Sequence, residues 1–170
     1  MDDPKQNNEN AVASDEDWET EFDLHRFFPY LVRIYYRAVS EAISSVYTEN
    51  FGLSVTEWRT MAVLGPHKSL SASQIVAQSS MDKVIVSRAI KGLQAQGLLK
   101  RDIDGDDRRR AVLRLTGQGQ ALFAKLVPMV KKAEENCLQS LNMQERNTLI
   151  GLMQRVRIDA ESQTPPKPGN

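Results

Sequence analysis

Lysine and arginine side chains are concentrated in one segment of the sequence, residues 83–114. This segment holds nine Lys or Arg against four Asp, although the whole chain of 170 residues has 22 basic and 22 acidic residues. Acidic residues gather instead in residues 1–23, where nine Asp or Glu accompany one Lys. Guanidinium and ammonium groups bind phosphate, so the basic segment indicates a surface for nucleic acid. The alternative is a charged face that is only solvated.

The sequence offers little for catalysis or for metal binding. Its two histidines, His25 and His67, and its one cysteine, Cys137, form no catalytic dyad, metal-ligand cluster or disulfide framework. Gly117 and Gly119 lack the rest of a dinucleotide-binding fingerprint. We therefore expect no enzyme activity, no catalytic or metal-binding residues and no cofactor.

Composition indicates one compact domain or a small two-lobed one. Hydrophobic residues make up 41% of the chain and charged residues 26%, which is enough apolar material for a core. No apolar run approaches the roughly 20 residues that a membrane span needs, and the acidic N-terminus does not resemble a signal peptide. We expect no membrane partner and a bacterial cytoplasmic location.

Helix-capping signals divide the middle of the chain into short helices. Ser54 and Ser71 each begin an S-x-x-E/Q capping box, which predicts the start of a helix. Asp82 can cap a further helix over residues 83–96, with Gly97 after its end. Three short helices in this order are typical of a helix-turn-helix.

A β-hairpin and longer helices surround these elements. Residues 98–103 and 108–115 flank an Asp-Gly turn signal, which predicts a hairpin directly after the third helix. An earlier helix should end before Gly52, and a long helix begins at Thr116, where Pro128 predicts a kink or a local break. The expected fold class is mainly α with a small β-wing: a winged helix-turn-helix lobe plus a helical dimerisation region.

The expected organisation has five segments: a disordered acidic tail (1–21), an N-terminal dimerisation helix (22–52), the winged helix-turn-helix DNA-binding lobe (53–116), C-terminal dimerisation helices (117–160) and a disordered tail (161–170). The outer helices carry apolar stripes. We expect a second copy of the chain to bury residues such as Leu31, Leu138, Leu149, Leu152 and Val156. The alternative is that these stripes fill the core of one monomer.

The second helix of a helix-turn-helix enters the major groove of DNA, and here that helix is 83–96. Its polar side and first turn supply the expected contacts Lys83, Val84, Ser87, Arg88 and Lys91. The wing at 104–110 adds Asp107, Arg108, Arg109 and Arg110, since a narrow minor groove attracts inserted arginine. Two alternatives stay open: an arginine-rich edge strand that only discourages aggregation, and a winged helix that binds protein instead of DNA.

Three segments resemble the MarR family of bacterial transcription regulators: LSVTEWRTMAVL (53–64), MDKVIVSRAIKGLQAQGLLKR (81–101) and DRRRAVLRLTGQG (107–119). The resemblance covers roughly residues 24–158 and includes the wing signature D-x-R followed by L-T and a glycine. It implies that Asp107 and Arg109 form the wing pair, with Arg109 in the minor groove. It also implies a homodimer on a palindromic operator in double-stranded DNA, most often as a repressor.

The resemblance further implies a small-molecule effector. The MDKVIVSRA segment is most similar to members that control catabolism of aromatic acids, which sense the acid or its CoA thioester. MarR-like proteins generally bind a small anion between the dimerisation region and the DNA lobe, so an anionic aromatic effector would release the operator. The candidate side chains near the junction of the first two helices are His25, Arg26, Tyr30, Arg33, Trp58, Arg59 and His67.

Alternatives stay open for these residues too. Trp58 could be a core residue, and Arg33 or Arg59 an ion-pair partner. Some relatives sense oxidants through a thiol, so a regulator that uses Cys137 is a further alternative. Its place on the apolar stripe of the long helix favours a structural cysteine.

Overall fold

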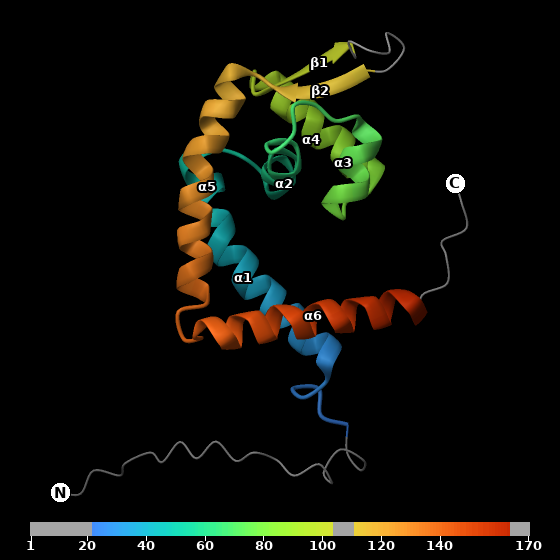
Figure 1. Cartoon of the computed structure of the whole chain (residues 1–170), viewed down its shortest axis with the longest axis vertical. Coiled ribbons are helices and arrows are strands. Elements are labelled where there is room, and N and C mark those ends of the chain that lie inside the picture. The colour runs from blue at the N-terminus through green and yellow to red at the C-terminus, as the bar shows by residue number, and fades with distance from the viewer. Residues whose placement is uncertain (1–21, 104–110, 164–170) are drawn as a thin grey trace, which may run out of the picture. The chain divides into compact units, whose positions relative to one another are not determined.

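The computed structural model describes residues 22–103 and 111–163, and these are mostly helical (Figure 1). The elements in chain order are α1 (Phe28–Phe51), α2 (Val55–Leu64), α3 (Ala72–Ser79), α4 (Lys83–Ala95), β1 (Leu99–Ile103), β2 (Ala111–Leu115), α5 (Gly117–Cys137) and α6 (Met143–Gln163). The predicted class, mainly α with a small β-wing, is confirmed. The chain divides into two compact units, residues 1–38 and 39–170, so that α1 begins in one unit and ends in the other.

The short helices α2, α3 and α4 begin at the caps that the sequence predicts. The hydroxyl oxygens of Ser54 and Ser71 accept the backbone N–H of Glu57 and Gln74, each at 3.2 Å. The side chains of Glu57 and Gln74 accept the backbone N–H of the two serines in return, at 2.8 Å. Asp82 accepts a 2.8 Å bond from the third residue of α4. These bonds satisfy donors that the first turn of a helix leaves unpaired.

Left-handed glycines follow α1 and α4, as expected. Gly52 has a φ of +65° and Gly97 a φ of +70°. Residues with a Cβ rarely adopt such angles. The two sharp turns set where α2 and β1 begin.

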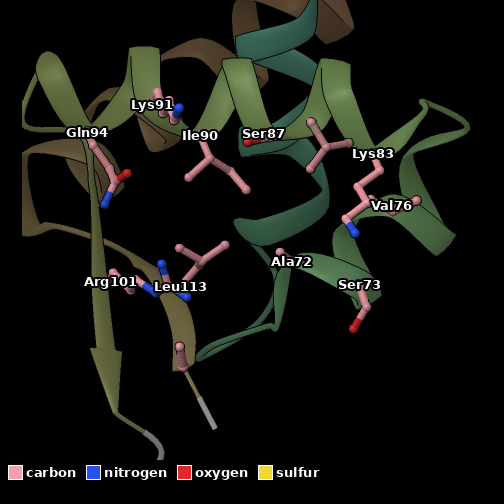
Figure 2. Close-up of a pocket in the computed structure, with 12 residues that line it drawn as sticks. Ala72, Ser73, Val76, Lys83, Ser87, Ile90, Lys91, Gln94, Arg101 and Leu113 are labelled. Atoms are coloured by element: carbon pink, nitrogen blue, oxygen red, sulfur yellow. The ribbon is translucent and has the colours of Figure 1, made fainter.

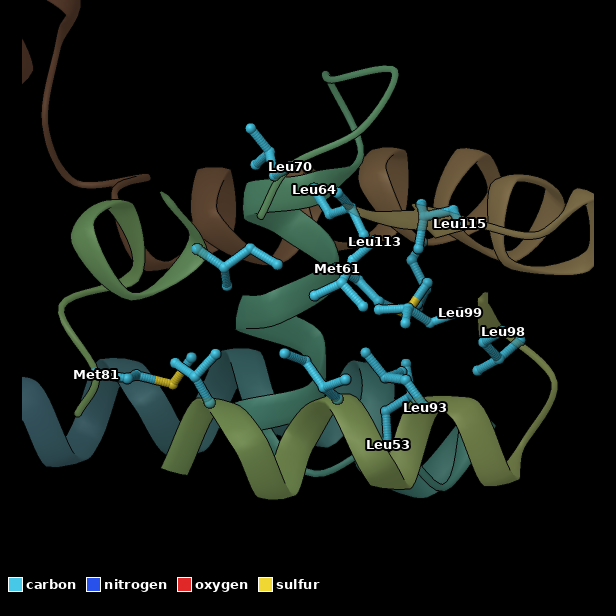
Figure 3. Packing of buried hydrophobic residues seen from close by; sticks show 14 of the residues in the cluster. Leu53, Met61, Leu64, Leu70, Met81, Leu93, Leu98, Leu99, Leu113 and Leu115 are labelled. Atoms are coloured by element: carbon cyan, nitrogen blue, oxygen red, sulfur yellow. The ribbon is translucent and has the colours of Figure 1, made fainter. Parts of the chain in front are cut away.

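The core lies where α2, α3, α4 and α5 meet the two strands. Figure 3 shows Met61, Leu64, Leu93 and Leu113 among the side chains packed together there. Burial of each such side chain contributes about 1.5–3 kcal/mol. From α4 the buried residues are Val86, Ala89, Ile90 and Leu93. Their three- and four-residue spacing buries one face of α4 and leaves the opposite face outward.

The strands form an antiparallel two-stranded sheet that is anchored to the helices. Leu99 lies opposite Leu115, and Arg101 opposite Leu113. Leu70, between α2 and α3, exchanges two backbone hydrogen bonds with Leu113, at 3.1 and 2.8 Å. The hairpin is therefore fixed to the helical part of the lobe near its base.

Helix α5 runs without interruption from Gly117 to Cys137, so the predicted local break at Pro128 is wrong. Proline has no N–H and removes one helical hydrogen bond, here the bond to the carbonyl of Ala124. Pro128 and Ala124 are both exposed, so water can bind the carbonyl that the helix leaves unpaired. The helix can therefore continue past this position.

Helix α6 starts at a cap formed by Asn142 and Glu145 and ends later than expected. The backbone N–H of Asn142 donates to Glu145 Oε2 at 2.8 Å, and the N–H of Glu145 donates to Asn142 Oδ1 at 3.0 Å. The helix continues to Gln163, so residues 161–163 are helical and not part of a disordered tail. Pro165 follows, and the residue before a proline disfavours helical backbone. The tails expected at 1–21 and 164–170 lie outside the described residues.

None of the helices in the described residues combines the length and the apolar character that crossing a membrane requires.

Candidate nucleic-acid interface

One face of α4 points outward and carries the residues predicted to contact DNA. Lys83, Val84, Ser87, Arg88 and Lys91 are all exposed, and Val84 is 59% exposed although it is apolar. The opposite face of α4 is held in the core, so the helix cannot turn to bury these side chains. Ammonium, guanidinium, hydroxyl and methyl groups therefore stand together, and these groups can contact phosphates and base edges in a major groove.

The cations of this face lack acidic partners within residues 22–103 and 111–163. Ion pairs in this part of the chain use Asp102, Glu135 and Glu161, and none includes a cation of α4. Cations without a partner stay available for phosphate. The outward face of α4 is therefore positively charged, although the whole chain has a formal net charge of zero.

A groove of about 440 Å³ lies between α3, α4 and the sheet (Figure 2). Ile90 and Leu113 point toward each other across it, and Arg101 lies beside Leu113. The polar and cationic residues that line the groove are Ser73, Lys83, Ser87, Lys91, Gln94 and Arg101. The groove thus continues the cationic face of α4 toward the sheet.

Three of these lining residues were not predicted from the sequence: Ser73, Gln94 and Arg101. Arg101 lies on the same face of the sheet as Leu99 and Leu113 because side chains alternate along a strand. That alternation in the segment Leu-Lys-Arg-Asp-Ile was the signal that could have placed Arg101 toward α4. Gln94 follows Lys91 by one helical turn, so helical spacing could have found it too.

The opposite face of the sheet has charges that compensate one another. Asp102 Oδ2 lies 3.6 Å from Lys100 Nζ and 4.0 Å from Arg114 Nη1. Exposed pairs of this kind add little to stability. Their effect is to lower the positive charge of this face compared with α4.

The other predicted DNA contacts, Asp107, Arg108, Arg109 and Arg110, lie outside the described residues. The strands that lead to them are paired as far as Ile103 and Ala111. Their roles therefore stay predictions.

Four of the predicted effector residues lie in the unit that ends at residue 38. The rings of His25 and Tyr30 are edge-to-face with centroids 5.8 Å apart, and the backbone N–H of His25 donates to Asp23 Oδ1 at 2.8 Å. Arg26 is half-buried and Arg33 exposed. A local cluster of cationic and aromatic groups is therefore present in this unit.

The other three predicted effector residues lie in the second unit. Trp58 is stacked between Tyr47, at 5.6 Å, and Phe123, at 6.0 Å between ring centroids. Because both rings stack on Trp58 and its side chain packs against the core cluster, the geometry favours the core alternative for Trp58. Arg59 is half-buried and His67 exposed.

The single cysteine and the metal-binding side chains add no further site. Cys137 is half-buried at the last residue of α5. Across the described ranges, no three His, Cys, Asp or Glu side chains come together as metal ligands.

Helices α2, α3 and α4, followed at once by a hairpin and with α4 facing outward, make the lobe a winged helix-turn-helix. Comparison with known proteins agrees with this class. Residues 51–110 match the model of the MarR family. This part of the chain is therefore similar to the winged-helix transcription regulators of the MarR family.

Named relatives and a solved structure extend the likeness beyond the matched segment. The putative transcriptional regulatory protein for the hcr operon of Thauera aromatica is 28% identical over 116 residues, which cover 68% of this chain and 70% of that protein. The transcriptional repressor NicR of Pseudomonas putida is 26% identical over 109 residues, which cover 64% and 68%. The structure of Bordetella bronchiseptica BpsR, described in connection with regulation of its DNA binding by 6-hydroxynicotinic acid, superposes with a TM-score of 0.74 at 22% identity. The superposition covers 81% of this chain and 98% of BpsR, so the two proteins share a fold.

Proposed function

We propose that this protein is a dimeric repressor of the bacterial cytoplasm that binds a palindromic DNA operator and releases it when a small aromatic acid, or its CoA thioester, binds. In this proposal α4 enters the major groove and the wing at 104–110 enters the minor groove. Two copies contact two half-sites about one helical turn apart. The effector binds most tightly to a dimer whose two DNA-binding lobes have a spacing that does not fit the operator. Its binding therefore moves the lobes apart or rotates them, and the operator is released.

The outward face of α4 is the observation that carries the proposal. It gathers Lys83, Arg88 and Lys91, which have no acidic partner in the described part of the chain. Val84 stays exposed beside them, and a thymine methyl group is a suitable contact for it. A face that only kept the protein soluble would not need an exposed apolar residue among its cations.

The dimer is supported by apolar surface that the single chain leaves uncovered. Helix α6 has 21 residues and none is buried. Leu152 is 49% and Val156 41% exposed, whereas Leu138 and Leu149 are half-buried. In the first unit, Leu31 is 44% exposed. Apolar surface of this extent is typical of an interface between proteins, which disfavours the alternative that the stripes fill the core of one monomer.

The effector class is supported by the relatives and by the chemistry of the candidate residues. DNA binding by BpsR, which shares this fold, is regulated by 6-hydroxynicotinic acid. In this chain His25, Arg26 and Tyr30 supply cationic and aromatic groups within one unit. Such groups suit a flat ring that carries a carboxylate.

Selection of duplexes from a random-sequence pool by the purified protein tests the DNA half of the proposal. We expect enrichment of a sequence with two-fold symmetry, and an affinity that falls steeply as salt rises. Enrichment of no sequence, or an affinity indifferent to salt, would contradict the proposal and favour a winged helix that binds protein.

A thermal-shift screen of aromatic acids, including 6-hydroxynicotinate, and of their CoA thioesters tests the effector half. A ligand that binds only the folded state raises the melting temperature by mass action. The same compound should weaken binding to the selected duplex. If no member of either chemical class does both, the effector assignment is wrong while the DNA half still stands.

A further inference from the structure

The carboxylate of Glu57, in the first turn of α2, bonds to two helices at once. Its Oε2 accepts the backbone N–H and the hydroxyl of Ser54, both at 2.8 Å. Its Oε1 accepts the side-chain N–H of Gln96 at 2.9 Å. The first pair of bonds closes the capping box of α2, and the third reaches the residue that directly follows α4.

Gly92 of α4 makes this arrangement possible. A Cβ added at Gly92 would overlap Glu57 Oε1 and come within 3.2 Å of the carboxyl carbon. Any other residue would push the carboxylate away from its partners. The position of the Glu57 carboxylate beside Gln96 therefore depends on a glycine inside α4, although glycine within a helix lowers helix stability by about 1 kcal/mol.

These contacts hold α4 at its C-terminal end, whereas the side chains that face DNA begin at its N-terminal end. Helix α4 has 13 residues, so about 18–20 Å separate its ends. A small rotation of α4 about its C-terminal end would therefore move Lys83 and Val84 farther than it moves the residues near Gln96. Contacts with base edges require placement to within about 0.5 Å.

We propose that Glu57 is a positioning residue for DNA recognition, acting through Gln96 and the space left by Gly92. This inference rests on the proposed function. In this proposal Glu57 does not contact DNA. Its hydrogen bond to Gln96 fixes the direction of α4. Its removal should therefore lower the preference for the correct sequence more than it lowers general affinity for DNA.

Replacement of Gln96 by alanine is the sharpest test, because it removes the bond to Glu57 and leaves the capping box of α2 intact. Gln139→Ala is a matched control, since Gln139 is exposed outside the lobe. We expect Gln96→Ala to weaken binding to the selected duplex about threefold to tenfold. Affinity for a scrambled duplex, its salt dependence and the melting temperature should stay at the wild-type values.

A second variant, Gly92→Ala, displaces the carboxylate itself and should lower the same preference at least as much. If Gln96→Ala binds the selected duplex as wild type does, the inference is wrong. It is also wrong if both affinities fall together with the melting temperature, because Glu57 then only stabilises the fold. If the wild-type protein prefers no duplex at all, the proposed function fails first and this inference fails with it.

Discussion

The hydroxyl of Thr116, at the start of α5, donates a 2.7 Å hydrogen bond to the carbonyl of Gly97, at the end of the turn that follows α4. The same oxygen caps α5 by accepting the N–H of Gly119 at 3.0 Å, and the backbone N–H of Thr116 donates to Leu98 at 3.0 Å. Helix α5 is thereby fixed to the α4–β1 turn. This contact gives a physical reason for the Leu-Thr-x-x-Gly pattern that follows the wing. Any movement of the start of α5 would reach the end of α4 directly.

Replacement of Gly119 by alanine should destabilise the lobe. A Cβ at this position would overlap the backbone carbonyl of Leu98, and backbone cannot move aside as the end of a flexible side chain can. Overpacking of this kind costs about 1–3 kcal/mol, measured as the free energy of unfolding in urea. Gly117→Ala is the control, because nothing lies within 4 Å of its added Cβ. It should be neutral or stabilise by up to about 1 kcal/mol. Equal effects of the two changes would show that Gly119 is not closely packed.

Replacement of Leu152 by aspartate should dissociate the dimer. A charge placed in a buried apolar interface is strongly unfavourable, and we expect self-association to weaken by at least about tenfold. Sedimentation velocity at micromolar concentration measures this change. Gln144→Asp, at an exposed position of the same helix, should leave the dimer intact. If Leu152→Asp sediments as wild type does, α6 does not form the interface.

Arg88 and Lys91 should respond differently to truncation. Arg88→Ala should cost about 1–3 kcal/mol on the selected duplex and relax the preference at one base pair, because arginine can bond to a guanine edge. Lys91→Ala should weaken all duplexes alike and reduce the salt slope by about 1, because a phosphate contact carries no sequence information. Fluorescence anisotropy across a salt series measures both quantities. Wild-type behaviour of both variants would contradict the placement of α4.

Arg109→Ala should weaken operator binding markedly if the wing enters the minor groove. Arg155→Ala, an exposed arginine of α6, is the matched control. The measurement is the affinity of both variants for a duplex whose outer base pairs are A·T-rich. Narrow A·T minor grooves attract arginine most. Unchanged affinity for Arg109→Ala would leave the wing without a role in DNA binding.

Oxidation should not control this regulator. Cys137 is half-buried on the inner stripe of α5, so Cys137→Ser should keep wild-type affinity for the selected duplex. Peroxide treatment should leave wild type and variant equally able to bind. A loss of binding that occurs only in the wild type would instead establish a thiol switch.

Local signals in the sequence predicted the elements of the lobe well. The capping boxes at Ser54 and Ser71, the cap at Asp82 and the glycines after α1 and α4 all act within a few residues, so their structure follows from nearby chemistry. The exposed face of α4 followed from helical spacing for the same reason. These features could be predicted without any knowledge of distant contacts.

Features that depend on distant parts of the chain were harder to predict. Trp58 was a candidate effector contact, but its ring stacks on those of Tyr47, in the preceding helix, and Phe123, 65 residues further along the chain. Arg101 entered the groove because the sheet turns that face toward α4. Pro128 did not break α5, because the unpaired carbonyl is on the exposed side of the helix. In each case the outcome was set by what surrounds the residue in the fold.

The most direct test of the account places a DNA-cleaving reagent on α4 itself. Cys137 is the one cysteine of the chain, so the double variant Cys137→Ser with Val84→Cys accepts a single tethered iron chelate. Bound to the selected duplex, it should cut the DNA in two patches related by two-fold symmetry and about one helical turn apart. A chelate at Gln144→Cys, in the same Cys137→Ser background, should give a different pattern of cuts. A single patch, or cuts no different from those of the control, would contradict a dimer that reads DNA with paired α4 helices.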